Sequence, residues 1–378
     1  MNPTARFADF TAGLTFADIP NSTLDRTKSV LLDTLGVAVK GSETDHGKIA
    51  IRRAWAGPPG SASVIGGGTA DPEAAAFANG VCAHAIDFDD VHGIIHPACS
   101  IVPGALAAAE ATDASGKALL TGIVAGYEVT ARVSSALNPR LRESGYHPTG
   151  VLNGLGVAAA AASIHDASPA VTRNAIAIAA DQASGLTAYH ESGSMMKHFH
   201  GGRPARDGLF AYDLANAGYV GDDDAINGTH GLADVLAEVQ PVETYVNALG
   251  STFEIDRTAI KPYPACRHTN GPIAAAISIH DDQDGLHPED FESITLIIYD
   301  LAASLYDKPA PTTHVQALLS LQYTVVTALL AGKLTVDQYD EEFYRDPEWR
   351  RLMDEMTFEV SDDYTDAFPN QWPSSVTV

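Results

Sequence analysis

Apolar residues recur at helical spacing through the first two thirds of the chain. Asn21 or Ser22 is placed to cap a first helix, and Asp71-Pro72, an N-cap residue followed by proline, predicts the start of another over residues 73–86. Further helices are expected over residues 102–111, 119–137, 149–164, 171–186, 203–217 and 232–239. Several of these segments are nearly all apolar and rich in alanine, which indicates helices buried in the middle of an α-helical domain.

The pattern changes after about residue 250. Runs with β-branched residues predict strands over residues 253–255, 294–299, 357–360 and 375–378, whereas residues 315–331 return to a helical pattern. We therefore predict a mainly α fold, with a large all-α domain over residues 1–255 and a smaller α+β domain over residues 256–378.

Composition narrows the classes of partner. The chain has 378 residues and a formal net charge of −25, which argues against nucleic acid as a partner and is also typical of a salt-adapted, halophilic surface. The three cysteines are few and widely spaced, and we find neither a signal-peptide pattern nor an apolar run that could cross a bilayer. We expect a soluble cytoplasmic protein that binds neither nucleic acid nor membrane.

One short stretch departs from this acidity. Residues 197–206, here called the basic segment, contain five basic or imidazole side chains and no acid. A local cationic pocket in an acidic protein could bind a polycarboxylate, with Lys197 and Arg203 flanking one carboxylate. The alternative is a basic surface patch that balances nearby carboxylates.

Three other stretches combine residues that could carry chemistry. Residues 84–97 contain three aspartates and three histidines, which could bind a divalent metal, although we prefer an acid/base pair of Asp87 and His96. His147 precedes Pro148 at a predicted helix start, where it would face a bound anion. Residues 261–271, with two prolines at the predicted domain junction, are either part of a ligand cleft or a rigid linker.

Familiar signatures of other reactions are missing from the sequence. It has no G-x-S-x-G elbow, no phosphate-binding loop ending in G-K-[ST] and no G-x-G-x-x-G dinucleotide motif after a strand. Proton transfer next to carboxylates, without a tightly bound cofactor, is the chemistry that remains.

Five ordered motifs resemble the MmgE/PrpD family. They are His84-x-x-Asp87-Phe88-Asp89-Asp90 with His96-Pro97, Gly145-Tyr146-His147-Pro148-Thr149, Lys197-x-x-His200-x-Gly202-x-x-Ala205-Arg206-x-Gly208, Lys261-x-Tyr263-Pro264-Ala265-Cys266 and Leu319-Ser320-Leu321-Gln322-Tyr323. The family contains 2-methylcitrate dehydratases, cis-aconitate decarboxylases and iminodisuccinate epimerases, which move protons at carbon in small polycarboxylates without a metal. The resemblance implies a large helical domain with a smaller α+β lid, no cofactor, and usually a homodimer.

The resemblance also implies a set of site residues. The expected catalytic residues are Asp87, His96, His147, Lys197 and Lys261, and the expected substrate-binding residues are His200, Arg203, Cys266 and Tyr323. The leading expectation is a cofactor-independent dehydratase of a 2-methylcitrate-type tricarboxylate in propionate metabolism. The alternatives are a dicarboxylate epimerase, a cis-aconitate-type decarboxylase, or an inactive, truncated family member that only binds a polycarboxylate.

Three departures from the family pattern qualify this expectation. Val91 stands where many members have threonine, and Cys266 stands where the decarboxylases have histidine, which makes decarboxylation the less favoured reaction. The sequence also stops at Val378, where the family pattern predicts a further segment that returns to the helical domain.

Overall fold

The computed structural model describes residues 2–238, 242–283 and 285–378. They form two compact units, each described here on its own. The helical unit comprises Met1–Ala85, Asp89–Ala188 and Met196–Ile260, and the mixed unit comprises Ile86–Phe88, Tyr189–Met195 and Lys261–Val378. The mixed unit thus includes two short segments from the first two thirds of the chain. A division of the sequence at one residue cannot describe these two units. The boundary after residue 255 stays a prediction.

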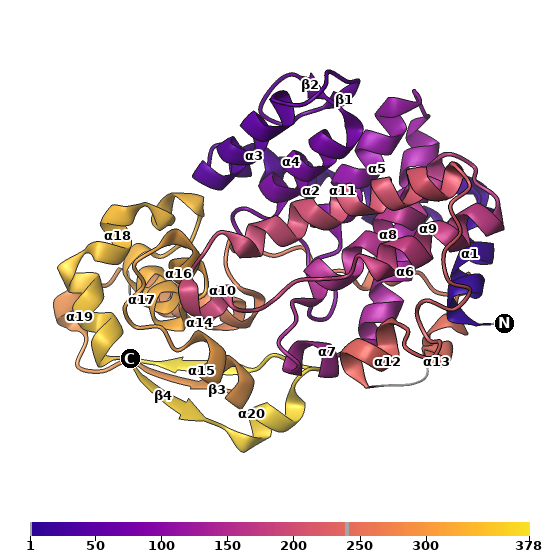
Figure 1. Ribbon diagram of the computed structural model, residues 1–378. Helices are drawn as coiled ribbons and strands as arrows, with labels where there is room; N and C mark the ends of the chain where they lie inside the picture. Colours follow the sequence, from indigo (N-terminus) through magenta and orange to yellow (C-terminus); the bar gives the residue numbers. More distant parts are fainter. Residues whose placement is uncertain (1, 239–241, 284) are drawn as a thin grey trace. The chain divides into compact units, whose positions relative to one another are not determined.

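The helical unit is built around α8, whose side chains are buried at almost every position. Helices α5, α6, α9 and α11 pack against it (Figure 1). The helices are α1 (Pro3–Gly13), α2 (Asn21–Gly41), α3 (Asp45–Trp55), α4 (Pro72–Ala83), α5 (Ala98–Ala111), α6 (Gly116–Leu137), α7 (Arg140–Glu143), α8 (Pro148–Ile164), α9 (Pro169–Asp181), α11 (Met196–Asn216), α12 (Leu232–Ala237) and α13 (Glu243–Val246). Two short strands, β1 (Ala62–Ser63) and β2 (Thr69–Ala70), pair antiparallel.

Local signals placed two helix starts correctly. Asp71 caps α4 by accepting a hydrogen bond from the Glu73 amide, with Pro72 at the first helical position. His147 is extended just before α8, which begins at Pro148. The predicted helix over residues 232–239 is α12, and residue 239 lies outside the described residues.

The start of α11 differs from the prediction. The helix begins at Met196, seven residues before the predicted residue 203, and contains Pro204 in its interior. Gly201 and Gly202 let this first part of α11 pack directly on α4, because a Cβ at either position would collide with a main-chain carbonyl of α4. Close backbone packing of this kind stabilises the helix and offsets the free energy lost because Pro204 has no N–H to donate a hydrogen bond.

Two other boundaries also differ. Helix α9 ends at Asp181 rather than near residue 186. The predicted strand at residues 253–255 is wrong, because Glu254–Arg257 form a 3₁₀ turn whose Glu254 joins a buried ion-pair group instead of a sheet.

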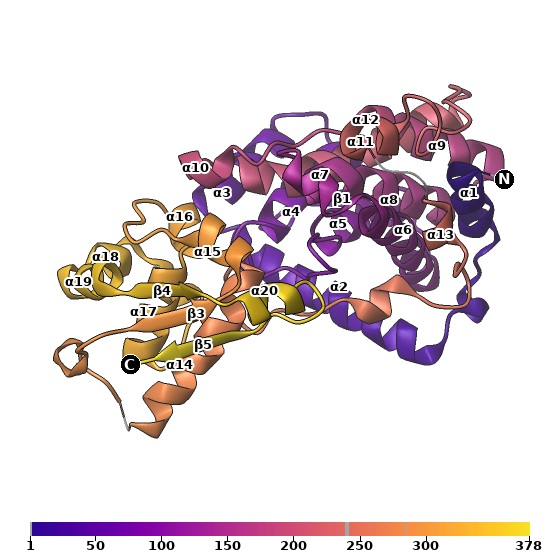
Figure 2. The same cartoon turned by 90° about the horizontal axis from the view of Figure 1, so that it is seen from below.

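The mixed unit contains a three-stranded sheet. The central strand β3 (Thr295–Ile298) pairs parallel with β4 (Thr357–Val360) and antiparallel with β5 (Ser374–Thr377) (Figure 2). All three strands fall within one residue of runs predicted from the sequence. The helices of this unit are α10 (Tyr189–Ser192), α14 (Asn270–Asp282), α15 (Asp300–Tyr306), α16 (His314–Leu318), α17 (Leu321–Ala331), α18 (Glu341–Arg345), α19 (Pro347–Glu355) and α20 (Asp362–Ala367).

The predicted helix over residues 315–331 is divided into α16 and α17. Ser320 separates them, and its hydroxyl accepts a hydrogen bond from the Tyr323 amide as the cap of α17. The fold class is confirmed: the protein is mainly α, with a smaller α+β part. Among the described residues no helix is both long enough and apolar enough to cross a membrane.

Candidate active site

Buried imidazole and amine side chains gather in the helical unit. They come from the end of α4 and the loop after it, from the residue before α8, and from the first turns of α11. We call this group the histidine–lysine cluster; its members are His84, His96, His147, Lys197, His198 and His200. All are buried except His96, which is half-buried. The ring centroid of His84 lies 5.2 Å from that of His96 and 5.9 Å from that of His147.

A chain of polar contacts runs through the middle of this cluster. His84 Nδ1 lies 2.7 Å from Oδ2 of Asp89, so the ring donates its Nδ1 proton to a carboxylate. His84 Nε2 then carries the lone pair, and the Lys197 ammonium donates to it over 3.3 Å. Asp89 and His84 therefore hold Lys197 in a fixed position.

The geometry also defines the tautomer of His96. Its Nδ1 lies 2.7 Å from the main-chain oxygen of Asp90 and 3.5 Å from Oδ2 of Asp89. A carbonyl oxygen can only accept a hydrogen bond, so Nδ1 carries a proton, and in the neutral ring Nε2 carries the lone pair. His96 thus has the form that a general base needs.

Asp90, whose main-chain oxygen contacts this histidine, is fully buried. Its carboxyl group accepts hydrogen bonds from the Ala98 amide at 3.0 Å and from the Tyr127 hydroxyl at 2.6 Å. Burial raises the pKa of Asp90 to about 8, although the bond from Tyr127 opposes the shift. The group is therefore largely protonated at neutral pH.

His147 and His200 form a second pair within the cluster. Their Nδ1 atoms lie 2.9 Å apart, so one ring must donate and the other accept. Burial lowers the pKa of His147 well below its usual value and that of His200 to about 3, so both rings are neutral near pH 7. In such a pair one Nε2 carries a proton and the other a lone pair.

His198, together with His46 of α3, was not predicted as part of the site. The two rings stack with centroids 3.9 Å apart, and His198 Nδ1 lies 2.9 Å from the main-chain oxygen of His84. Burial also lowers the pKa of His198 well below its usual value. The position of His198 in the basic segment was the one sequence feature that could have indicated its place in the cluster. Nothing in the sequence connects His46 to this cluster.

The basic segment is buried rather than a surface patch. Arg203 donates to the main-chain oxygens of Gln182, Gly150 and Ser184 and forms an ion pair with Asp207 at 2.8 Å. Through these contacts Arg203 joins α11 to neighbouring segments, which explains why this charged side chain is buried. Arg206 is exposed and also pairs with Asp207. Substrate binding by Arg203 and His200 stays a prediction.

The mixed unit contains a second charged site. Lys261 Nζ donates to the Asp87 carboxylate at 2.6 Å and to the Asp87 main-chain oxygen at 2.7 Å, and both side chains are buried. Asp87 has a left-handed backbone with φ of 51°. Burial and the nearby Asp87 charge raise the pKa of the Cys266 thiol, so Cys266 stays protonated at neutral pH.

We expected Asp87 to orient His96 or His147, and this stays a prediction. Within the helical unit, Oδ2 of Asp89 lies 3.5 Å from Nδ1 of His96. The roles of Asp87, His96, His147, Lys197 and Lys261 stay predictions. Tyr323 of the mixed unit is buried and donates its hydroxyl hydrogen to the Gln338 carbonyl.

Part of the helical unit's cluster has the ligand types of a metal site. Atoms of His84, Asp89 and Cys99 lie within 4.8 Å of one another. Burial raises the pKa of the Cys99 thiol well above its usual value, although a bound metal ion would itself favour the thiolate. The hydrogen bonds that link Asp89, His84 and Lys197 are an alternative explanation of this arrangement.

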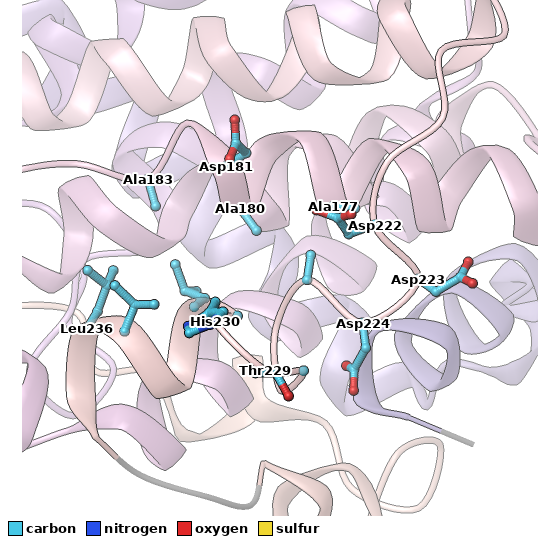
Figure 3. A pocket seen from close by; sticks show the side chains of 15 residues that line it. Ala177, Ala180, Asp181, Ala183, Asp222, Asp223, Asp224, Thr229, His230 and Leu236 are labelled. Atoms are coloured by element: carbon cyan, nitrogen blue, oxygen red, sulfur yellow. The ribbon is translucent and has the colours of Figure 1, made fainter.

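A pocket of about 540 Å³ lies elsewhere in the helical unit (Figure 3). It is lined by α9, by α12 and by the segment between α11 and α12, with the carboxylates of Asp181, Asp222, Asp223 and Asp224 around it. None of the predicted site residues lines this pocket. Its acidic lining would repel a polycarboxylate.

Fold and site together define a two-part, mainly helical protein whose buried polar groups are histidines, lysines and aspartates. The model of the MmgE/PrpD N-terminal domain matches residues 5–244, and that of the MmgE/PrpD C-terminal domain matches residues 263–378. The chain belongs to the MmgE/PrpD family.

Relatives in this family carry the name cis-aconitate decarboxylase. The human protein is 28% identical over 379 residues, covering 97% of this chain and 78% of the relative. The mouse protein is 29% identical, covering 97% and 77%. An Aspergillus oryzae protein named cis-aconitate decarboxylase-like protein oryM is 28% identical, covering 90% and 76%. Decarboxylases are lyases, so the comparisons support a lyase of this family.

Proposed function

We propose that this protein is a cofactor-independent lyase that dehydrates a small tricarboxylate of the 2-methylcitrate type. The reaction begins with removal of a proton from the carbon next to a carboxylate. The observation that carries the proposal is the histidine–lysine cluster, in which burial keeps several imidazoles neutral beside a positioned lysine. Family membership and the names of the relatives support the lyase class.

The cluster supplies the two functions that such a reaction needs. His96, with its lone pair on Nε2, accepts the proton from carbon, and the His147–His200 pair offers a donor and an acceptor for the leaving hydroxyl group. Lys197, held by His84, stabilises the enolate-like charge that develops on the substrate carboxylate. A role for Lys261 as a second cation for a substrate carboxylate rests on the family resemblance alone.

Cys266 favours dehydration over decarboxylation. Protonation at carbon after loss of CO₂ requires an acid that gives up its proton near neutral pH. The thiol of Cys266 has a raised pKa and is therefore a poor acid. By the family resemblance, the decarboxylases have a histidine at this position. Decarboxylation of cis-aconitate is the second candidate, because the relatives carry that name.

The test is to incubate the purified protein in D₂O with 2-methylcitrate, citrate or cis-aconitate. We expect NMR to show deuterium at the substrate α-carbon together with an unsaturated acid, and no release of CO₂. Lys197→Met should abolish the exchange. Lys28→Met, the same change at an exposed lysine of α2, is the matched control and should retain it.

Three outcomes would change the proposal. Release of CO₂ from cis-aconitate without dehydration would favour the second candidate. Exchange by Lys197→Met at the wild-type rate would remove Lys197 from the mechanism. No exchange at low or high salt would favour a protein that only binds a polycarboxylate. The homodimer, the cytoplasmic location and the salt-adapted source stay predictions.

A further inference from the structure

Three buried side chains of different chemistry meet in the helical unit, and we call them the His–Asp–Cys triplet. His84 follows α4, Asp89 lies in the loop after it, and Cys99 lies in the first turn of α5. One ligand atom from each lies within 4.8 Å of the other two, and all three side chains are fully buried. An imidazole, a carboxylate and a thiolate are the three ligand types that proteins use for zinc, and three protein ligands with a water molecule are a common set.

The spacing of these atoms is close to that of a tetrahedral metal site. Zinc bonds of about 2.0–2.1 Å to nitrogen and oxygen and about 2.3 Å to sulfur place neighbouring ligand atoms about 3.4–3.6 Å apart. Nδ1 of His84 and Oδ2 of Asp89 lie 2.7 Å apart, so they need to separate by only about 0.7 Å to hold the ion between them. The hydrogen bond between them is then replaced by two bonds to the metal.

The charges of the triplet suit a divalent cation. The Cys99 thiol donates to the His96 main-chain oxygen at 3.1 Å, and this bond is lost when Sγ binds a metal and releases its proton to solvent. The thiolate of Cys99 and the carboxylate of Asp89 then balance the two positive charges of the ion, while the His84 ring is a neutral ligand. Nδ2 of Asn153 lies 3.9 Å from Sγ and is placed to donate to the thiolate.

The triplet also borders a side chain that solvent reaches. Nδ1 of His96 lies 3.5 Å from Oδ2 of Asp89, and the His96 side chain is 13% exposed. Asp89 is therefore the ligand nearest to a route by which an ion enters.

We propose that His84, Asp89 and Cys99 form an inhibitory site for Zn²⁺. A metal on Nδ1 leaves the neutral His84 ring with its proton on Nε2. Lys197 donates to the lone pair of that Nε2 over 3.3 Å, so after metal binding its ammonium faces a donor and a divalent cation instead of an acceptor. The metal and Lys197 in this position therefore exclude each other. The inhibitory effect rests on the proposed function, which uses Lys197, whereas metal binding does not.

Cobalt is a direct probe of the triplet, because Co²⁺ bound to a thiolate has an intense charge-transfer band in the near ultraviolet. We expect titration of the reduced protein near neutral pH to give this band at one ion per chain. Zn²⁺ should displace it, and excess Mg²⁺, which prefers oxygen ligands, should not. Cys99→Ser should abolish the band. Cys82→Ser is the matched control, since Cys82 is a buried free cysteine of α4 outside the triplet, and it should retain the band.

Two further variants test the remaining contacts. Asp89→Asn removes one negative ligand and should weaken Co²⁺ binding at least about tenfold. Lys197→Met should strengthen it at least about tenfold, because the positive charge that competes for the His84 ring is gone. A side chain that only supported the fold would not increase affinity when it is replaced. Lys28→Met, the change at an exposed lysine, should leave the affinity unchanged.

The outcomes separate the metal site from its effect on the reaction. Absence of the thiolate band, or a band that persists in Cys99→Ser, would overturn the site. Equal or weaker binding by Lys197→Met would overturn the exclusion of Lys197 by the metal. Proton exchange that continues at saturating Zn²⁺ would overturn the inhibitory role. A thiolate-bound metal in a protein that exchanges no proton would support the site and contradict only the proposed function.

Discussion

Asp90 allows a quantitative test of how the candidate site is buried. Its pKa is raised from 3.8 to about 8, with burial as the main cause. At pH values between these two, the Asp90 carboxyl group has lost its proton in the unfolded chain but keeps it in the folded protein. The stability linked to Asp90 is therefore fully present below the unfolded pKa and is lost as the pH rises towards about 8.

Asp90→Asn removes this titration and keeps the hydrogen bonds. The amide oxygen can accept from the Ala98 amide, and the amide nitrogen can donate to the Tyr127 oxygen. One proton corresponds to about 1.4 kcal/mol per pH unit. From pH 5 to pH 8 the variant should therefore gain about 4 kcal/mol over the wild-type protein, and the difference should level off above pH 8.

The assay is urea unfolding of both proteins by circular dichroism at a series of pH values. Titrations of the other groups cancel in the difference between the two free energies of unfolding. A second variant, Tyr127→Phe, removes the hydrogen bond that lowers the pKa of Asp90. In that background the difference in unfolding free energy caused by Asp90→Asn should become constant only at a higher pH. A difference that stays constant from pH 5 to pH 8 would show that Asp90 is ionised in the folded protein and would refute the reasoning.

Three further changes test other parts of the structure. Gly201→Ala places a Cβ against the Gly80 carbonyl and should destabilise the protein by at least about 2 kcal/mol in urea unfolding; an unchanged midpoint would contradict the close packing of α11 on α4. Arg132→Met leaves the buried Glu128 carboxylate without its ion pair at 2.7 Å and should cost about 3–5 kcal/mol at pH 8. Burial raises the pKa of Glu128 to about 7, so the group is largely protonated at pH 5 and the loss there should be smaller; equal losses would argue against this ion pair. Cys266→His should raise the ratio of CO₂ release to dehydration in an assay with cis-aconitate and citrate, and an unchanged ratio would remove Cys266 from the choice between the two reactions.

The sequence predicted those features that depend on neighbouring residues. The starts of α4 and α8 were predictable because an N-cap residue and a proline are adjacent in each case. The strands β3, β4 and β5 were predictable from short β-branched runs. The early start of α11 was not, because it depends on packing between Gly201 and Gly80, which are 121 positions apart. Helix propensity around Pro204 gives no signal of such a contact.

The candidate site shows the same limit. The motifs pointed to the segments from which the histidine–lysine cluster comes, but spacing could not show that Lys197 contacts His84 or that Asp89 lies beside two histidines. Asp87 and Asp89 are only two positions apart, yet they belong to different compact units. Sequence spacing does not reveal this division.

Burial, rather than charge alone, determines what the basic segment can do. An exposed cluster of histidines near neutral pH would be partly charged and would attract anions without discrimination. Here burial lowers the pKa of His147, His198 and His200, so these rings can accept or pass on protons but carry little positive charge. Arg203 is already paired with Asp207. In the proposed reaction, the attraction for a substrate carboxylate in this segment is therefore assigned to Lys197, and proton transfer is assigned to its neutral neighbours.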